Sequence, residues 1–498
     1  MLRRLAWILV LVMLFQTACA ETVQTAPDYI IEGYDGDLTY RVWDNNLFFS
    51  RMQEKTGISF QFRQSRDYDQ WTRRKKELLE GKDLPDVLFK AEPSQAEVRD
   101  LYRAGYLIDL APLIQQNAPD LWKLLEDHPE WKKAITMEDG AIPALPAINT
   151  LQNNNAMWIN TAWLKKLSLE MPTTAEELTE VLRAFKNGDP NGNYQQDEIP
   201  LTFLGMWELR FLGHAFGIID NDWYISEKDN AVTSSLTTEE NRAFLTWLHQ
   251  LWHEELIDRN GFTNTDSLRQ ITDEKKASPY GIILSCTPLT ILPANAISQY
   301  SLLEPLRYEG RQIYRDLTGD LVRGTFALTT LCKEPEKMLS WVNELYTPEG
   351  YRMACYGIEG DEYIWSDDGY WEWNTVIETV ANEILPTHTL SEGGVMPGLT
   401  DPEFQMKYRD EKTRKTVEAL NRLKSFSVFP YPLVTLPADQ EARITEIQDG
   451  LSRYAEQTMA CFVTGDIELT DENWQRFCDT VNEKGLPELI AIFQDALK

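Results

Sequence analysis

Residues 38–63 read LTYRVWDNNLFFSRMQEKTGISFQFR and contain two kinds of hydrophobic spacing. Residues 38–43 and residues 58–63 alternate apolar and polar side chains, which is typical of β-strands. Between them, residues 45–56 follow helical spacing and end at Gly57, a residue type that favours the C-cap of a helix. A strand, a helix and a second strand in so short a stretch predict a βαβ unit, and hence a parallel sheet.

The mixture of helices and strands continues outward from this unit. Residues 69–80 are a second predicted helix, and residues 84–89 are a third predicted strand. Further helices are predicted at 173–186, 238–256 and 336–346, where apolar side chains recur three and four residues apart. Because the two element types are interspersed and not segregated, the sequence predicts the α/β class.

Length and charge limit the classes of protein to which the chain can belong. The chain has 498 residues, and at about 150 residues per domain this length predicts about three domains or two large lobes. Asp and Glu number 78 against 48 Lys and Arg, so the net charge is −30. This charge argues against nucleic-acid binding, because a phosphate backbone needs a basic surface.

The first twenty residues read MLRRLAWILVLVMLFQTACA and predict a secretory signal peptide. Its apolar run is too short to span a membrane comfortably. The sequence allows two alternative modes of processing. One is cleavage after Ala20, and the other is processing at a lipobox-like site, at which Cys19 becomes a lipid anchor. We favour the lipid anchor, with residues 1–19 as the signal and residues 20–37 as a tether. Both sites predict an extracytoplasmic protein, either a membrane-anchored cell-surface lipoprotein or a periplasmic or secreted one.

Five cysteines remain after such processing, and an odd number cannot pair completely within one chain. We therefore expect free thiols, with a single Cys461–Cys478 disulfide as the alternative. The other three are Cys286, Cys332 and Cys355.

Enzymatic signatures are absent from the sequence. It contains no G-x-S-x-G motif, no P-loop and no G-x-G-x-x-G motif after a predicted strand. His249 and His253 have the spacing of a helical zinc pair, but Gln250 stands where a metalloprotease needs glutamate. The sequence therefore predicts a protein that is not an enzyme.

One motif points to a metal. Residues 189–198 read DPNGNYQQDE and place oxygen-bearing side chains at positions 1, 3, 5 and 9, as a Ca²⁺ loop does. It is not a standard EF-hand, because Tyr194 stands at the glycine position and Pro200 at the position of the bidentate glutamate. The alternative is a polar turn without metal. The predicted ligands of a structural Ca²⁺ are Asp189, Asn191, Asn193, Gln195 (through its carbonyl), Asp197 and Glu198.

Several blocks along the chain carry a family resemblance. They are EGKDLPDV at 80–87, MWINTAWL at 157–164, PTT at 172–174 and YGIEG at 356–360, together with the loop at 189–198. In this order they resemble extracellular solute-binding proteins of bacterial ABC importers, in the carbohydrate-binding group that includes the alginate-oligosaccharide and maltose binders. The loop resembles the calcium loop of the alginate-binding branch.

The resemblance implies two α/β lobes of the type II periplasmic-binding-protein kind, joined by a hinge that the chain crosses several times. The implied lobes are 38–150 with 282–325, and 151–281 with 326–498. The crossings are expected near 145–155, near 280–285 and near Gly324. A ligand bound between the lobes favours the closed state.

Ligand contacts are expected at the carboxyl ends of the strands. This rule selects Trp43 and Asp44 after the first predicted strand and Glu92 after the third. Aromatic rings that stack on sugars are sought among tryptophans in predicted loops, although packing in the core is the competing role. The complete set of predicted contacts is Trp43, Asp44, Glu92, Trp207, Tyr356, Glu359, Trp365, Trp371 and Trp373.

The leading hypothesis is a monomer that captures an oligosaccharide or related sugar and delivers it to the transmembrane subunits of an ABC permease. A peptide, a polyamine or a sugar acid is the alternative ligand, because Arg41, Lys90 and Arg210 are available to bind an anion. A secreted glycoside hydrolase is a further alternative, and it needs two carboxylates about 5–10 Å apart. A partner that presents ligand to a membrane kinase is the fourth.

Overall fold

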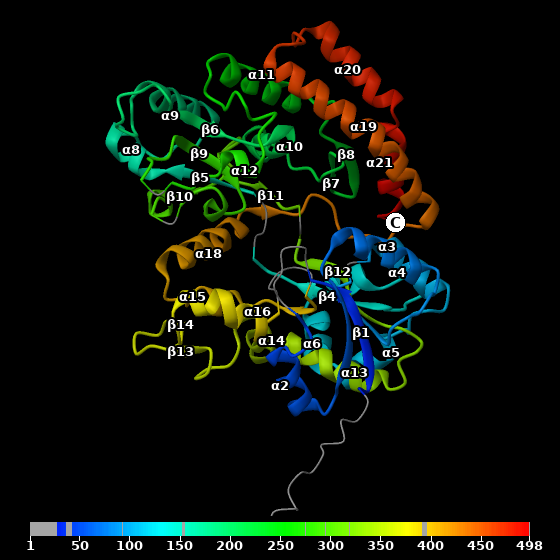
Figure 1. The fold of residues 1–498 in the computed structure, drawn as a ribbon. Coiled ribbons are helices and arrows are strands. Elements are labelled where there is room, and N and C mark those ends of the chain that lie inside the picture. The colour runs from blue at the N-terminus through cyan, green and yellow to red at the C-terminus, as the bar shows by residue number, and fades with distance from the viewer. Residues whose placement is uncertain are drawn as a thin grey trace, which may run out of the picture.

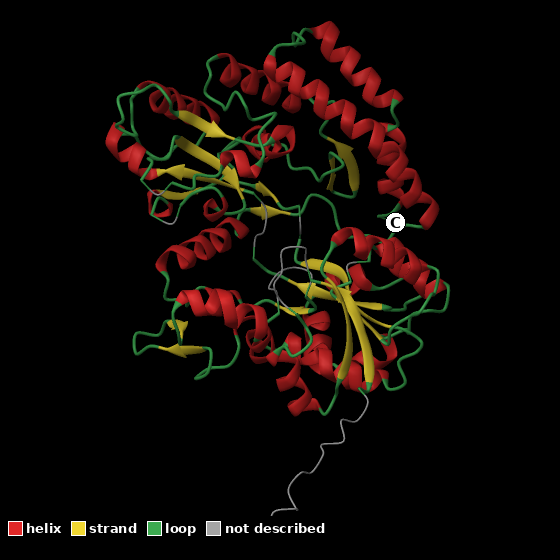
Figure 2. Ribbon diagram, viewed as in Figure 1, coloured by secondary structure: helices red, strands yellow, loops and turns green. Residues whose placement is uncertain are grey.

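The computed structural model describes residues 27–35, 42–91, 93–151, 155–273, 275–293, 295–317, 319–390 and 396–497. These residues form two lobes, each with its own β-sheet and hydrophobic core (Figure 1). In both lobes the main sheet lies inside and helices pack around it (Figure 2). The predicted α/β class and two-lobed architecture are confirmed.

The first lobe is built on a six-stranded sheet in the order β15-β4-β12-β3-β1-β2. β1 runs parallel to its neighbours β2 and β3, whereas β12 is antiparallel to both β3 and β4. β1 lies inside the sheet, and its residue Ile31 is fully buried. The bounds are Tyr29–Tyr34 (β1), Phe60–Ser65 (β2), Val87–Phe89 (β3), Ala144–Ile148 (β4), Leu321–Leu328 (β12) and Gly398–Leu399 (β15).

Helix α2 of the first lobe begins and ends close to where the sequence signals predict. The side chain of Asn46 caps α2 by accepting a hydrogen bond from the backbone of Phe48, and Gly57 ends this helix in the left-handed region at φ 74°. The bounds are Leu47–Thr56 (α2), Tyr68–Leu79 (α3), Gln95–Arg103 (α4), Ala111–Asn117 (α5), Pro119–Asp127 (α6), Pro129–Ile135 (α7), Pro335–Asn343 (α13) and Pro348–Tyr356 (α14). Shorter elements follow, namely Glu344–Tyr346 (η4), Tyr363–Trp365 (β13), Trp371–Trp373 (β14), Ile377–Thr379 (α15), Val380–Ile384 (η5), Leu385–Thr387 (α16) and Pro402–Gln405 (α17).

The second lobe is built on a four-stranded sheet in the order β10-β5-β9-β6. β5 is antiparallel to β10 and to β9, and β6 is parallel to β9. The strand bounds are Ala156–Asn160 (β5), Ile199–Thr202 (β6), Tyr280–Ser285 (β9) and Tyr300–Leu303 (β10), and a separate hairpin has Ile225–Lys228 (β7) and Ala231–Ser234 (β8).

The clearest predicted helix, α9, is capped as expected. Thr174 accepts a hydrogen bond from the Glu177 backbone at 3.2 Å, and the Glu177 carboxylate accepts one from the Thr173 backbone at 2.7 Å. The α-helices of this lobe are Thr161–Leu167 (α8), Ala175–Asn187 (α9), Gly205–Leu209 (α10), Glu239–His253 (α11), Asp266–Arg269 (α12), Ala438–Thr464 (α19), Asp471–Glu483 (α20) and Leu486–Asp495 (α21). Three 3₁₀ helices are Arg210–Phe216 (η1), Pro288–Thr290 (η2) and Ile297–Gln299 (η3).

The chain crosses between the lobes three times. Core residues up to Ile148 belong to the first lobe, those from Ala156 to Tyr314 to the second, those from Leu321 to Phe404 to the first, and those from Leu423 onward to the second. The crossings are therefore residues 149–155, residues 315–320 and the segment that contains α18 (Glu411–Lys424). Beyond α18, Ser427–Val428 (β16) pairs in parallel with Tyr314–Arg315 (β11), next to the second crossing.

Hydrogen bonds and ion pairs hold these crossings together. The Asn149 backbone N–H donates to the Asp320 carbonyl at 2.8 Å, and the Tyr314 hydroxyl donates to the Asn155 carbonyl at 2.5 Å. Lys424, the last residue of α18, pairs with Asp316 at 2.9 Å and with Asp320 at 2.7 Å. The three crossings thus form one hinge.

The predicted lobe ranges need correction. Residues 282–325 were expected in the first lobe, yet β9 and β10 lie in the second sheet because β9 pairs with β5 and β6. Residues 326–408 belong to the first lobe, because β12, α13 and α14 pack in its core. The crossing expected at 280–285 is therefore a central strand, and the one expected near Gly324 lies just before β12.

The first strand also lies elsewhere. β1 is formed by residues that we expected to belong to the tether at 20–37. Of the strand expected at 38–43, Val42 and Trp43 are outside any strand, and the other residues lie outside the described part of the chain. A strand inside a parallel sheet is apolar on both faces, so YIIEGY lacks the alternation on which the prediction relied.

All five cysteines of the described chain are free thiols, including Cys461 and Cys478. No helix in the described ranges combines the length and the hydrophobicity needed to cross a membrane.

Candidate binding site

The topology brings one edge of each sheet to the hinge. β4 ends at Ile148, on the same edge as the carboxyl ends of β1 and β3, because β12 is antiparallel to both β3 and β4. Residues 149–155 then lead to Ala156, which pairs with Ser285 at the carboxyl end of β9. An extended chain of this length covers at most about 25 Å. The carboxyl edges of the two sheets therefore lie near each other, where ligands of open α/β sheets bind.

At the first-lobe edge, a buried polar group follows β1 and β3. Lys90, held in the left-handed region at φ 55°, forms an ion pair with Asp35, and both side chains are fully buried. The Trp43 indole N–H donates to Asp35 at 3.2 Å, and the Trp43 ring is fully buried. Trp43 therefore packs in the core and presents no ring face to a ligand, which corrects the prediction. Asp44 beside it is exposed, and Glu92 lies outside the described residues.

Three aromatic side chains gather at the same edge. Tyr34 ends β1, and its ring is stacked on Trp71 of α3 with centroids 6.5 Å apart and an interplanar angle of 6°. Tyr68 meets Tyr34 edge-on at 5.9 Å and is 56% exposed. The Trp71 indole N–H donates to the Ala91 carbonyl at 3.1 Å, which fixes this stack to the end of β3. Tyr34 and Tyr68 are thus ring candidates that the sequence reasoning missed, although an aromatic pair three residues apart at a helix start was visible.

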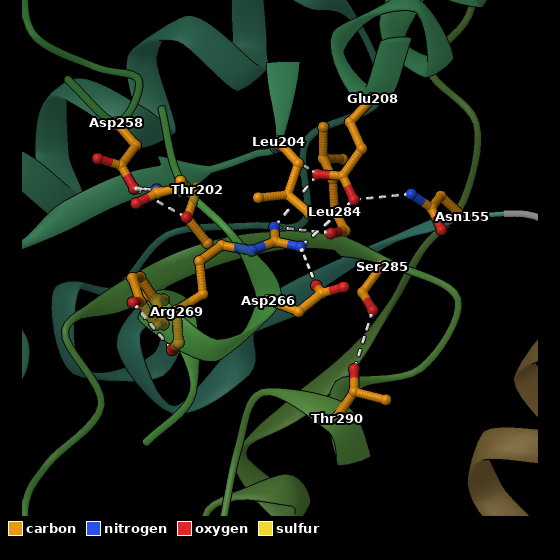
Figure 3. Close-up of polar contacts among 12 residues, drawn as sticks. Asn155, Thr202, Leu204, Glu208, Asp258, Asp266, Arg269, Leu284, Ser285 and Thr290 are labelled. Atoms are coloured by element: carbon orange, nitrogen blue, oxygen red, sulfur yellow. Dashed lines mark hydrogen bonds and ion pairs between the residues drawn. The ribbon is translucent and has the colours of Figure 1, made fainter. Parts of the chain in front are cut away.

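At the second-lobe edge, Glu208 of α10 collects several donors (Figure 3). Its carboxylate accepts hydrogen bonds from the Asn155 side chain at 2.8 Å and from the Leu204 backbone at 2.6 Å, and it pairs with Arg269 at 3.2 Å. Burial raises the pKa of Glu208 to about 7, while the positive charge of Arg269 opposes the shift. Because Asn155 belongs to the first crossing, Glu208 connects α10 directly to the hinge.

Arg269 completes this cluster from α12. Its guanidinium donates to the Leu284 carbonyl at 3.1 Å, near the end of β9, and pairs with Asp266 at 3.1 Å. Figure 3 shows its guanidinium lying between the carboxylates of Glu208 and Asp266. Neither Glu208 nor Arg269 entered the predicted set, because a charged residue gives no sequence signal of burial.

Trp207 is the predicted contact whose position fits a ligand best. It stands between the buried residues Met206 and Glu208 on α10, so the backbone is anchored, while the side chain is 46% exposed. A fixed backbone with an exposed ring suits stacking on the C–H face of a sugar.

The remaining predicted residues gather around the β13–β14 hairpin, which Figure 1 shows at the far left of the first lobe, below α15. Trp371 is buried and stacked on Phe404 at 4.5 Å, and Tyr356 lies 5.0 Å from the same ring. These two residues are core residues, which corrects the prediction for them. Trp365 is 38% exposed, Trp373 is half-buried and Glu359 is exposed, so burial does not rule out these three predicted contacts. They lie on or beside the β13–β14 hairpin and not at the two sheet edges, so the site at the edges does not include them.

In the predicted metal loop, two carboxylates accept hydrogen bonds from other residues of the same loop. Asp189 accepts hydrogen bonds from the backbones of Gly192 at 3.0 Å and Asn193 at 3.1 Å. The side chains of Asn191 and Asn193 both donate to the Asp197 carboxylate, at 2.8 Å and 2.9 Å. Five of the six predicted ligand residues are therefore in one compact turn, where Gln195 donates its backbone N–H to Asn193 at 2.7 Å.

The carboxylate of Glu198 is the group in this loop whose surroundings best suit a bound cation. Its Oε1 atom is buried and has no hydrogen-bond partner. Burial raises the pKa of Glu198, and the charges of Asp197 and Asp189 raise it further. In the described part of the chain no three His, Cys, Asp or Glu side chains are arranged to hold a metal, so amide and carbonyl oxygens would have to supply much of the coordination.

Two α/β lobes joined at sheet edges that bear polar and aromatic groups are the architecture that this chain shares with solute-binding proteins of known structure. No family model matches the chain. The fructooligosaccharide ABC transporter substrate-binding protein FusA of Streptococcus pneumoniae is 28% identical over 377 residues, which are 69% of this chain and 69% of FusA. The polygalacturonan/rhamnogalacturonan-binding protein YtcQ of Bacillus subtilis is 19% identical over 429 residues, covering 84% and 82% of the two chains.

Solved structures agree on the fold. FusA in complex with kestose superposes with a TM-score of 0.73 at 24% identity, covering 94% of this chain and 98% of FusA. An HMO-binding solute-binding protein from Bifidobacterium longum infantis gives a TM-score of 0.80 at 21% identity, covering 95% and 98%. A FusA EF-hand mutant and the alginate-binding protein AlgQ2 without calcium ion are also similar, with TM-scores of 0.72 and 0.67. The predicted resemblance is confirmed, since relatives and structural neighbours are carbohydrate substrate-binding proteins of ABC transporters.

Proposed function

We propose that this chain captures a neutral oligosaccharide between its lobes, outside the cytoplasm, and delivers it to the permease subunits of an ABC transporter. The observation that carries the proposal is that the first crossing, residues 149–155, joins two sheet edges that bear rings and hydrogen-bonding groups. Trp207 on one edge and Tyr68 on the other supply exposed ring faces. The names of the relatives point to the same class of ligand.

Charge pairing at the two edges favours a neutral ligand. Lys90 is paired with Asp35, and Arg269 is paired with Glu208 and Asp266. A sugar acid needs an unpaired cation and a polyamine needs an unpaired carboxylate, because a buried charge without a partner is costly. Arg210, another cation considered above, pairs with Asp220 at 3.1 Å, and Arg41 lies outside the described residues.

The geometry of this site favours binding of a sugar without cleavage of its glycosidic bonds. Glu208 has the raised pKa of a general acid, but it is 2% exposed and its oxygens already accept hydrogen bonds from Leu204, Asn155 and Arg269. A hydrolase needs an acid that reaches the glycosidic oxygen and a second carboxylate across the ligand. We therefore expect kestose incubated with the protein to be recovered intact, and release of fructose or sucrose would support the hydrolase alternative.

Calorimetry with a neutral and an acidic ligand tests the proposal. Kestose and trigalacturonic acid represent the ligand classes in the names of FusA and YtcQ. We expect neutral oligosaccharides to bind and to raise the melting temperature by mass action, and trigalacturonic acid to do neither. Binding of trigalacturonic acid but of no neutral oligosaccharide would overturn the proposal that the ligand is neutral. If no member of a panel of fructan, HMO-type and N-glycan oligosaccharides binds, the proposed capture of a neutral oligosaccharide is wrong.

The loop at 189–198 is proposed as a structural Ca²⁺ site. The partnerless Glu198 Oε1 and the turn formed around Asp189 and Asp197 support it. The ion would neutralise the carboxylates and hold the turn between α9 and β6. Ligand capture does not require it to contact the sugar.

We further propose that residues 1–19 are a signal peptide and that Cys19 carries the lipid anchor. Both lie outside the described residues, so the support is the sequence alone. Replacing Cys19 by serine should release the protein from the membrane fraction, which immunoblotting of cell fractions would show. If the wild-type protein is already absent from the membrane fraction, cleavage after Ala20 is favoured instead.

A further inference from the structure

A cavity of about 580 Å³ lies between α18 and the edge strand β10. Leu302 of β10 and Ala419 of α18 line opposite sides, and Trp158 of β5 contributes to its wall. Its volume falls within the range of about 300–1,000 Å³ that is usual for small-molecule sites. No predicted contact residue lies in it.

This cavity adjoins the second-lobe edge of the candidate site. Ser285 ends β9 at that edge, and its carbonyl accepts a hydrogen bond from the Trp158 indole N–H at 3.0 Å. Pro288, three residues further along the chain, already lines the cavity. Figure 3 shows Ser285, which is hydrogen-bonded to Thr290, below the cluster that contains Glu208, and Figure 1 shows α18 beside β10. An extended ligand that passes Ser285 at the sheet edge would therefore enter the cavity after crossing one short loop.

Five of the seven charged side chains that line the cavity are in ion pairs. Arg422 of α18 pairs with Glu304 after β10 at 2.8 Å. Lys415 pairs with Glu411 at 2.6 Å. Glu418 pairs with Arg414 at 3.5 Å. Because most of the lining charges already have partners, and Asp410 caps α18 by accepting from the Thr413 backbone, the cavity suits an uncharged occupant better than an ion.

The wall formed by β10 suits hydroxyl groups. Within the described residues, β10 pairs only with β5, so it is an edge strand whose outer backbone groups have no partner strand. Such an edge presents N–H donors and C=O acceptors in alternation. Leu302, Ile297 and Ala419 add apolar surface for C–H groups. Donors, acceptors and apolar surface together match a saccharide unit.

We propose that this cavity is a subsite for the distal units of an oligosaccharide whose other end lies between the two sheet edges. The inference rests on the proposed function and adds a length preference to it. Units beyond those held at the edges gain contacts with α18, which is itself the third crossing of the hinge. Longer ligands therefore bind more tightly than short ones of the same composition.

Filling the cavity tests this subsite. Ala419→Trp places a ring in the cavity, and Asn421→Trp places the same ring on the exposed face of the same helix, outside the lining. Kd is measured by calorimetry for kestose, fructo-nystose and longer fructooligosaccharides, or for whichever neutral series of the panel binds. We expect the wild type and Asn421→Trp to bind the longest member about tenfold more tightly than the shortest, and Ala419→Trp to lose that gain with the shortest member unaffected.

The outcomes separate this inference from the proposed function. Equal length dependence in the wild type and Ala419→Trp, or no length dependence in the wild type, refutes the subsite while leaving capture of an oligosaccharide intact. No binding of any panel member by the wild type refutes both. Should Ala419→Trp fail to fold, Ser301→Trp on the opposite wall, where the side chain is exposed, fills the same cavity.

Discussion

Trp207 carries the sharpest prediction at the scale of single residues. Its ring is 46% exposed on a backbone anchored by buried neighbours, so Trp207→Ala removes ring area without opening the core. We expect Kd for the bound oligosaccharide to rise about tenfold or more, as for aromatic residues at binding hot spots, with an unchanged melting temperature of the free protein. Calorimetry gives the first quantity and thermal denaturation the second.

Trp365→Ala is the matched comparison for Trp207→Ala. Trp365 is similarly exposed, at 38%, but lies on the β13–β14 hairpin and not at a sheet edge. If the site lies at the edges, this variant keeps the wild-type Kd. A loss of affinity in Trp365→Ala with none in Trp207→Ala would move the site to the hairpin.

His214 makes the stability of the second lobe depend on pH. Its Nδ1 lies 2.6 Å from the Phe211 carbonyl, its Nε2 accepts a hydrogen bond from the Leu306 backbone at 2.9 Å, and burial lowers its pKa to about 4. Between pH 6.5 and pH 4 the unfolded chain binds a proton that the folded chain excludes, so stability falls as the pH falls. From pH 7 to pH 5 this contribution amounts to about 2 kcal/mol.

Urea denaturation at pH 7 and pH 5 measures this effect. His214→Gln removes the titrating group, so its unfolding free energy should change less between the two pH values than that of the wild type. His128→Gln, at a partly exposed position in the first lobe, is the control and should follow the wild type. An identical pH dependence in all three proteins would show that the pKa of His214 is the same in the folded and unfolded chains, and would refute this prediction.

The tryptophans show what sequence can establish about single residues. Exposure of Trp207 was predicted from its loop-like surroundings, and the same reasoning failed for Trp43 and Trp371. Trp43 is buried because Phe89 of β3 packs against it at 5.5 Å, and Trp371 because Phe404 does so at 4.5 Å. Both partners are more than thirty positions away in sequence, so no local pattern reports the contact.

The pairing of β1 with β3 sets a prediction at the scale of secondary-structure elements. A Cβ atom added at Gly33 would lie 1.6 Å from the Phe89 carbonyl oxygen, so Gly33→Ala must push these two strands apart. We expect a loss of about 3 kcal/mol in unfolding free energy, measured by urea denaturation. Gly450→Ala in α19 is the control, because nothing lies within 4 Å of its added Cβ. The control should be neutral or slightly stabilising, since alanine favours a helix by about 1 kcal/mol over glycine.

The turn between α9 and β6 should respond to calcium. With Ca²⁺ the wild type should melt at a higher temperature than with EDTA, because an ion that binds only the folded chain stabilises it. Asp197→Asn removes a charge on which two asparagine side chains converge, and it should abolish most of that difference. Asp229→Asn in the β7–β8 turn removes a carboxylate outside the loop and should retain it. If EDTA leaves the wild-type melting temperature unchanged, the loop is a polar turn without metal.

Helices were predictable from sequence to a degree that strands were not. Residues 45–56, 173–186 and 238–256 coincide with α2, α9 and α11 to within a few positions, because caps and apolar spacing are local signals. β1 was placed too late, since a strand inside a parallel sheet lacks alternation. β9 was mistaken for a hinge crossing, because its partners β5 and β6 are identified only by distant pairing.

At the scale of the whole molecule, the two lobes have separate cores. The core of the first is assembled from residues 29–148 and 321–404, and that of the second from residues 156–314 and 423–493. The family resemblance implied two lobes joined by a hinge that the chain crosses several times, but its ranges placed residues 282–314 and 326–404 in the wrong lobes. Length alone implied only that two large lobes were possible. The exchange of segments between lobes was not predictable, since it depends on which sheet each strand joins.

Separate cores make the mode of ligand binding testable. A ligand held between two sheet edges contacts both lobes, so it should slow amide exchange at the ends of β1 and β3 and at the ends of β6 and β9 together. Closure around the ligand should also lower the radius of gyration, because a ligand that contacts both lobes binds the closed state better. Hydrogen–deuterium exchange and small-angle scattering, with and without the bound oligosaccharide, measure the two effects.

Trp207→Ala provides the internal control for this last experiment, because it removes a contact on one edge only. At a ligand concentration that saturates the variant, protection at the first-lobe edge should persist, and protection around α10 should weaken. Protection confined to one lobe of the wild type, with no change in the radius of gyration, would mean that the ligand binds on a single lobe. In that case the hinge would serve only to connect two independently folded halves, and the paired edges would not be the site.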